Sequence, residues 1–193
     1  MRLMNEMLNR THSLRRVSAL ASLPILAAAS LAAQPTSRPE RPSLNISAYT
    51  IDAEIDTATH RLTAKATLTL TAPENAEMVS FGFHPALKVN KITDDTGKVL
   101  TGERSADGTI RVTPSAPPVA DKPMHWTFDY EGVISGTEDG PVEGLKLAAI
   151  QEPITYLLYP ARWFPTTGFM TDRFTAEIHM RVPQGMKDRK SVV

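Results

Sequence analysis

The 193-residue sequence contains no cysteine, and this absence excludes several kinds of protein. A disulfide-stapled fold, a thiolate metal site and a cysteine nucleophile all need that residue, and so does a lipoprotein anchor. An excess of basic charge is also absent, because 21 Lys and Arg residues balance 21 Asp and Glu residues. The sequence therefore lacks the electrostatic footprint of a nucleic-acid-binding protein.

Hydrophobic residues make up 41% of the chain, which is too many for a disordered protein. The first 34 residues nevertheless differ from the rest. They begin with a basic stretch, continue with an uncharged Ala- and Leu-rich run over 17–33, and close with small residues. This order predicts a secretory signal peptide over residues 1–34. An uncleaved N-terminal anchor is the alternative, although the run is short for a membrane span and contains Pro24.

We therefore expect an exported protein, periplasmic or secreted, with no stable membrane span after signal cleavage. Residues 35–44 are rich in proline and predict an extended tether. Residues 45–187 form the predicted domain. The last six residues, 188–193, match what a common sequencing-library adapter would encode, so we predict a non-native tail on a truncated gene fragment. A natural charged tail is the alternative.

Residues 45–187 are dominated by alternation of apolar and polar side chains. Residues 49–56 and 61–70 alternate on either side of a short turn, and Trp126, Phe128 and Tyr130 form one aromatic face. Period-2 patterning predicts half-buried antiparallel strands, and no helix-period segment of useful length occurs after residue 44. Many short strands with regular turn signals predict an all-β fold, an antiparallel β-sandwich or a barrel.

Catalytic motifs are missing from this pattern. No two of the histidines after the signal peptide (His60, His84, His125 and His179) are four residues apart, so no helix can present a His-Glu-x-x-His zinc face. Neither a Gly-x-Ser-x-Gly elbow nor a phosphate-binding glycine loop occurs. We expect the histidines to be solvated, and the alternating Asp52, Glu54 and Asp56 to lie on a solvated strand face. The residues predict no active site in this chain.

Residues 151–169 form the most unusual segment, since five aromatic residues lie close in sequence to Pro160 and Pro165 there. Such a cluster either packs in a core or inter-domain seam, or lines a binding surface. The packing interpretation is favoured, and it makes Tyr159, Trp163 and Phe164 candidates for a domain interface.

Three motifs carry a family resemblance. They are Tyr-x-Ile-x-Ala-x-Ile-Asp-x-x-x-His-x-Leu at 49–62, Phe-Asp-Tyr-Glu-Gly at 128–132, and Ala-Arg-Trp-Phe-Pro at 161–165. In order and spacing they resemble the N-terminal domain of zinc aminopeptidases of the alanyl-aminopeptidase and leukotriene-hydrolase type, peptidase family M1. The resemblance implies a saddle-shaped β domain that packs on a thermolysin-like catalytic domain.

The zinc ligands and the catalytic glutamate of that family belong to the catalytic domain, and none of their motifs occurs here. The resemblance thus implies no cofactor in this chain, zinc in a missing C-terminal catalytic domain, and peptide substrates for the intact enzyme. Some members contribute a Gln-x-Glu segment to the site of the substrate's free amine. Gln151 and Glu152 are the nearest match, although they lie further from the Ala-Arg pair than usual.

The sequence as a whole predicts the non-catalytic N-terminal β domain of an exported zinc metallo-aminopeptidase, inactive on its own. One alternative is a free-standing exported β-sandwich that binds carbohydrate or peptide. Another is a structural domain of a larger cell-surface protein.

Overall fold

The computed structural model describes residues 44–106, 108–136, 146–167 and 173–187. The chain divides into two units, Met1–Arg38 and Pro39–Val193, and every described residue belongs to the second unit. The predicted signal peptide, nearly all of the predicted tether and the predicted non-native tail lie outside the described residues. Residues 137–145 also lie outside the described residues.

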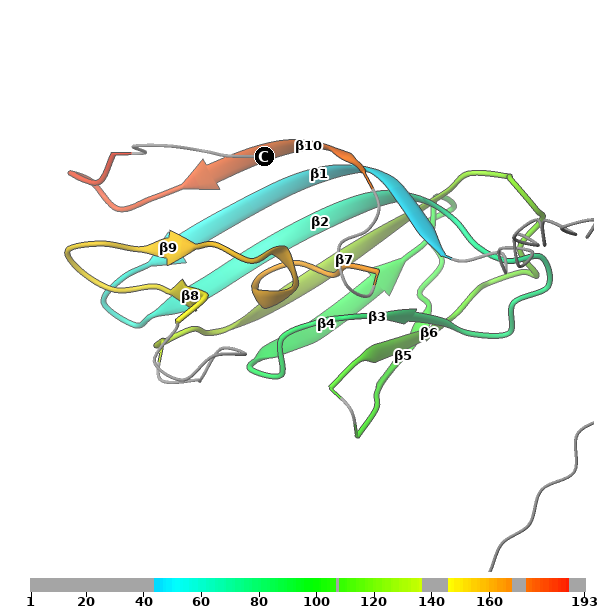
Figure 1. Ribbon diagram of the computed structural model, residues 1–193, viewed down its shortest axis with the longest axis horizontal. Coiled ribbons are helices and arrows are strands. Elements are labelled where there is room, and N and C mark those ends of the chain that lie inside the picture. The colour runs from blue at the N-terminus through cyan, green and yellow to red at the C-terminus, as the bar shows by residue number, and fades with distance from the viewer. Residues whose placement is uncertain (1–43, 107, 137–145, 168–172, 188–193) are drawn as a thin grey trace, which may run out of the picture. The chain divides into compact units, whose positions relative to one another are not determined.

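Five strands form the large sheet, in the order β10-β1-β2-β7-β4. Figure 1 shows these strands running side by side. Their bounds are Asn45–Asp56 for β1, Arg61–Thr71 for β2, Leu87–Thr93 for β4, Met124–Val133 for β7 and Thr175–Arg181 for β10.

The β1–β2 hairpin confirms the strand prediction at residues 49–70. The strands pair antiparallel from Asn45 opposite Thr71 to Asp56 opposite Arg61, and their apolar side chains are buried, except that of the half-buried Ala48. A turn joins them, and Asp56 accepts the backbone N–H of Ala58 through Oδ1 at 2.9 Å. Hydrogen bonding, first from the Thr59 side chain, lowers the pKa of the Asp56 carboxyl.

Strand β10 pairs with β1 in parallel, from Ala48 opposite Thr175 to Glu54 opposite Arg181. The sequence predicted antiparallel pairing throughout. The β1–β10 pair is parallel, and the large sheet is therefore mixed. The difference has a physical reason: alternation fixes which side chains face the core but is the same for both strand directions. A parallel pair needs a long crossover, which the segment between β7 and β10 supplies.

A second layer lies in front of the large sheet in the view of Figure 1. It contains a three-stranded sheet in the order β3-β6-β5, a two-stranded sheet of β8 and β9, and one short 3-10 helix, η1. The bounds are Val79–Phe81 (β3), Thr101–Arg104 (β5), Ile110–Thr113 (β6), Ala148–Ala149 (β8), Tyr156–Leu157 (β9) and Pro160–Arg162 (η1).

The core lies between these layers and is rich in aromatic contacts. The Phe81 ring is 5.1 Å from Phe128 and 5.9 Å from Trp126, and Phe83 is 4.9 Å from Tyr130. Each large side chain buried in this way stabilises the fold by roughly 1.5–3 kcal/mol. The packing confirms the predicted all-β fold and the predicted aromatic face of β7. Among the described residues, no helix has the length and apolar character needed to span a membrane.

Candidate functional site

Residues 146–167 carry the site residues predicted from the sequence, and the structure binds this segment to the end of the β1–β2 hairpin. The Ile134 backbone N–H donates to the His60 carbonyl oxygen at 2.8 Å, and Ile150 N–H donates to the Ile134 carbonyl oxygen at 2.8 Å. His60 Nδ1 lies within hydrogen-bonding distance of the Ile150 carbonyl oxygen. His60 is therefore half-buried and tied to the segment rather than freely solvated.

Gln151 and Glu152 follow β8 and lie beside the β1–β2 turn. The buried Thr57 hydroxyl donates to Glu152 Oε1 at 3.3 Å, while the Glu152 residue itself is exposed. The Gln151 N–H donates to Thr155 Oγ1 at 3.1 Å, which orders the loop between β8 and β9. An exposed carboxylate held on a built loop has the chemistry to attract an ammonium group.

The aromatic residues of the segment take different places. Trp163 is 6% exposed and Phe164 is 3% exposed, and both belong to the core. Their rings lie 4.7 Å apart, and the Phe164 ring lies 5.0 Å from that of Tyr49 on β1. These two side chains pack in the core of the domain, whereas the sequence made them candidates for a domain interface. Tyr159 is half-buried. Of the three residues predicted at a domain interface, it is therefore the one whose side chain is still partly accessible. Phe169 lies outside the described residues.

Sequence reasoning missed the exposed apolar side chains of the same segment. Ile154 and Leu158 are each 66% exposed. They lie two residues to either side of Tyr156, which belongs to the two-residue strand β9 and is half-buried. The period-2 spacing of these three residues was the available signal, but the prolines of the segment concealed it.

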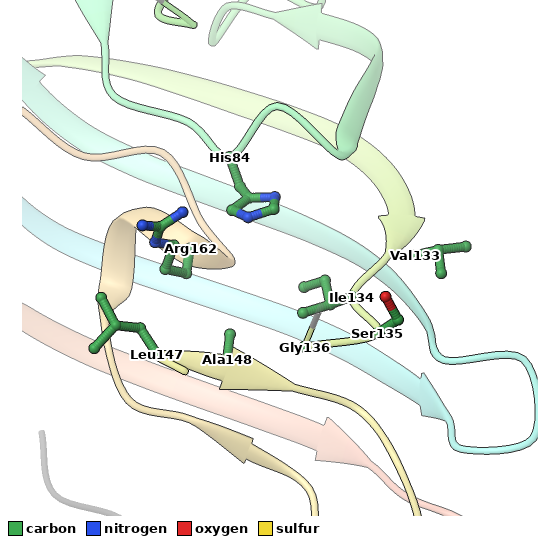
Figure 2. A pocket seen from close by; sticks show the side chains of 8 residues that line it. All are labelled: His84, Val133, Ile134, Ser135, Gly136, Leu147, Ala148 and Arg162. Carbon is green, nitrogen blue, oxygen red and sulfur yellow. The ribbon is translucent and has the colours of Figure 1, made fainter. Parts of the chain in front are cut away.

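A small cavity of about 20 Å³ lies between the connection from β3 to β4, the end of β7, β8 and η1 (Figure 2). Its lining includes the titratable side chain of His84 and the cationic side chain of Arg162. His84 is 5% exposed, whereas the sequence predicted a solvated side chain. The prediction was wrong because the connection after β3 crosses over the core. The Ala86 N–H donates to His84 Nδ1 at 3.2 Å.

A wider groove of about 450 Å³ lies over the polar face of β10, β1, β2 and β7. Its charged walls pair with one another. His179 Nδ1 is 2.9 Å from Asp52 Oδ1, and Arg181 Nη1 is 3.0 Å from Glu54 Oε2. Hydrogen bonding to Asp52, and then to Glu177, raises the pKa of the His179 imidazole. The exposed positions of Asp52 and Glu54 confirm the prediction of a solvated strand face.

Metal-binding chemistry is missing from the part of the chain that the structure describes. Within those ranges, no group of three or more His, Cys, Asp or Glu side chains could hold a metal ion. The residues present therefore do not fit a zinc site of the usual three or four ligands.

Comparisons with known proteins place the fold. No protein-family model matches the chain, and no curated protein matches it in sequence. Among solved structures, an M1 zinc metallopeptidase from Deinococcus radiodurans, a mutant bound to a Tyr-Ser-Ala substrate, is similar with a TM-score of 0.58 and 16% identity. That likeness covers 76% of this chain and 34% of the other. Native yeast LTA4 hydrolase is similar with a TM-score of 0.51 and 11% identity, over 78% of this chain and 26% of the other.

The chain thus spans about a third of the length of the M1 metallopeptidase that it matches. The likeness confirms the fold that the three sequence motifs implied. The described residues have an all-β fold that resembles part of the M1 zinc metallopeptidases and LTA4 hydrolases.

Proposed function

We propose that this chain is the non-catalytic N-terminal β domain, a fragment, of an exported zinc metallo-aminopeptidase that removes N-terminal amino acids from peptides. The observation that carries the proposal is the likeness to M1 zinc metallopeptidases over a third of their length, together with the family motifs at 49–62, 128–132 and 161–165. In this proposal the zinc belongs to the catalytic domain of the parent enzyme, because the His-Glu-x-x-His motif that would hold it does not occur in this sequence.

The role of the domain is to wall the active-site cleft and to help bind the free amine of the substrate. Two features support this role. Glu152 presents an exposed carboxylate on a loop that Thr57 and Thr155 hold in place, and an ammonium group is the natural partner of such a carboxylate. Ile154 and Leu158, on the same segment, expose apolar surface beside it, which suits contact with a neighbouring domain.

The parent gene tests the proposal directly. We expect the genomic reading frame beyond codon 187 to continue and to encode a His-Glu-x-x-His motif, with a further glutamate about 20 residues later as third zinc ligand. A natural stop codon at or near codon 193, with a soluble monomeric product, would contradict the proposal and favour a free-standing binding module.

The role in amine binding needs a test on the intact enzyme. Replacing Glu152 by Gln removes the charge and keeps the size, so the KM for an alanyl anilide should rise about tenfold, equal to about 1.4 kcal/mol. Glu74→Gln, at an exposed loop position, is the matched control and should leave KM unchanged. Equal KM values for the two variants would contradict the amine-binding role.

Export is tested by mass spectrometry of the mature N-terminus, expected next to residue 34.

A further inference from the structure

The side chain of Thr57, in the turn between β1 and β2, contacts the carboxylate of Glu152 directly. Its hydroxyl donates to Glu152 Oε1 at 3.3 Å, across 95 residues of sequence. Thr57 is 5% exposed, whereas Glu152 is an exposed residue. Because a buried hydroxyl without a partner is costly, this bond favours the side-chain rotamer of Glu152 that keeps Oε1 within reach of Thr57.

The turn that carries Thr57 is itself held on both sides. The Thr59 hydroxyl donates to the Asp56 carboxylate at 2.7 Å. On the other side of the turn, the Ile134 N–H donates to the His60 carbonyl oxygen at 2.8 Å. A group that is ordered beforehand loses less conformational entropy when it makes a contact. The Thr57 hydroxyl is therefore placed in advance to orient a neighbouring side chain.

The other contacts of the loop between β8 and β9 act on its backbone. His60 Nδ1 lies within hydrogen-bonding distance of the Ile150 carbonyl oxygen, and the Thr155 hydroxyl bonds to the backbone of Gln151 at 3.1 Å. These contacts fix where the loop lies, but none of them reaches the side chain of Glu152. Among the described residues, Thr57 is thus the partner that sets the direction of the carboxylate. It takes up Oε1 and leaves Oε2 for a ligand.

We propose that Thr57 is a positioning residue, which orients the Glu152 carboxylate toward the free amine of the substrate. This inference rests on the proposed function, in which Glu152 helps to bind that amine. A primary ammonium group presents three donors, and a carboxylate already held in one rotamer binds it better than one that must first be ordered. Thr57 acts through Glu152 rather than on the substrate.

The test on the intact enzyme is Thr57→Val, which removes the hydroxyl and keeps the shape. The KM for an alanyl anilide should rise about fivefold with kcat unchanged, because the same binding is lost from the ground state and the transition state. Thr57→Ser, which keeps the hydroxyl, should have a KM close to that of the unmodified enzyme. Thr166→Val is the matched control and should leave KM unchanged. Thr166 is 3% exposed, and in the described part of the chain its hydroxyl has no hydrogen-bond partner.

A second background separates positioning from a general loss of structure. In a Glu152→Ala enzyme, Thr57→Val should have no further effect on KM, since no carboxylate is left to position. An equal rise in KM in both backgrounds would overturn the inference. An unchanged KM in Thr57→Val, where Glu152→Gln raises it, would also overturn the inference but leave the amine-binding role intact. If Glu152→Gln itself leaves KM unchanged, the amine-binding role fails, and the inference falls with it.

The purified chain gives a readout that does not need the catalytic domain. Three-bond couplings measured by NMR should report a single χ1 rotamer of Glu152 in the unmodified chain and in Thr57→Ser, and an average over rotamers in Thr57→Val. The same couplings in Thr57→Val as in the unmodified chain would overturn the inference, whatever the kinetics of the intact enzyme show.

Discussion

The hydroxyl of Tyr49 donates a hydrogen bond to the carbonyl oxygen of Pro165 at 3.0 Å, across 116 residues of sequence. Tyr49 begins the first family motif, and Pro165 ends the third. The same tyrosine ring also contacts Phe164 and Phe174, with centroids 5.0 and 4.9 Å away. One side chain thus attaches the segment after η1 to the central hairpin of the large sheet, and through it the site segment is held on the fold.

Removing this hydroxyl should destabilise the domain. Tyr49→Phe keeps the ring contacts but leaves the buried carbonyl of Pro165 without this donor, which costs about 1–3 kcal/mol. Urea denaturation followed by tryptophan fluorescence measures the loss. Tyr156→Phe, at a half-buried position of β9, is the control, and its effect should stay within about 0.5 kcal/mol. A Tyr49→Phe protein as stable as the unmodified chain would show that the hydrogen bond contributes nothing.

A side chain at Gly132 should not be tolerated. A Cβ atom there would lie 2.2 Å from the Ala86 carbonyl oxygen and 2.9 Å from the Leu87 Cα. Leu87 is the first residue of β4 and pairs with Gly132, and Ala86 immediately precedes it, so moving these backbone atoms would disturb the β4–β7 ladder. We expect Gly132→Ala to lower the free energy of unfolding by about 1–3 kcal/mol or more.

Gly82→Ala is the control for that substitution, because its Cβ would meet the Thr166 side chain at an ordinary 3.4 Å. Thermal unfolding of both variants compares them. If Gly132→Ala and Gly82→Ala unfold at the same temperature, β4 and β7 do not approach as closely as described.

The His179 ion pairs should make stability depend on pH. Hydrogen bonding to Asp52 and Glu177 raises the pKa of the folded imidazole above its ordinary value of about 6.5. The stabilisation is therefore fully present below the unfolded pKa and is lost as the pH rises through the folded pKa. Asp52→Asn should lower the NMR titration midpoint of His179, and its stability deficit should be larger at pH 5.5 than at pH 8.5. A midpoint that does not move would show that the pair does not form in solution.

The purified chain should be unable to hydrolyse peptides by itself. We expect it to retain no stoichiometric zinc after dialysis, as measured by elemental analysis, and to leave an alanyl anilide intact. The reason is that the sequence contains no His-Glu-x-x-His zinc motif. Hydrolysis that a chelator abolishes and zinc restores would contradict this expectation.

Several features of the fold could be predicted from the sequence because they depend on local patterning. The alternation in residues 49–56 and 61–70 predicted both strands of the hairpin and the faces they bury, as the structure confirms. The Phe-Asp-Tyr-Glu-Gly motif marked β7, although only the structure explains its glycine: the carbonyl of Ala86, on the neighbouring chain segment, occupies the space of a side chain.

The candidate site was less accessible to such reasoning. Gln151 and Glu152 were singled out by resemblance, but their attachment to the β1–β2 turn depends on Thr57, 95 residues away from Glu152. His84 carries no sign of burial in its local sequence, since it falls on the polar side of the alternation of residues 79–84 and Pro85 follows it. It is buried because the connection from β3 to β4, on which it lies, crosses over the core.

The sequence by itself determined that the chain is all-β, where most of the strands lie, and which side chains of the hairpin and β7 face inward. These properties follow from side-chain periodicity, which each strand carries independently of its neighbours. Only the tertiary structure decided that β10 lies parallel to β1, that Trp163 and Phe164 are core residues, and that Arg162 and His84 wall one cavity. These depend on contacts between segments far apart in the chain, and no local pattern specifies which distant partner a side chain will meet.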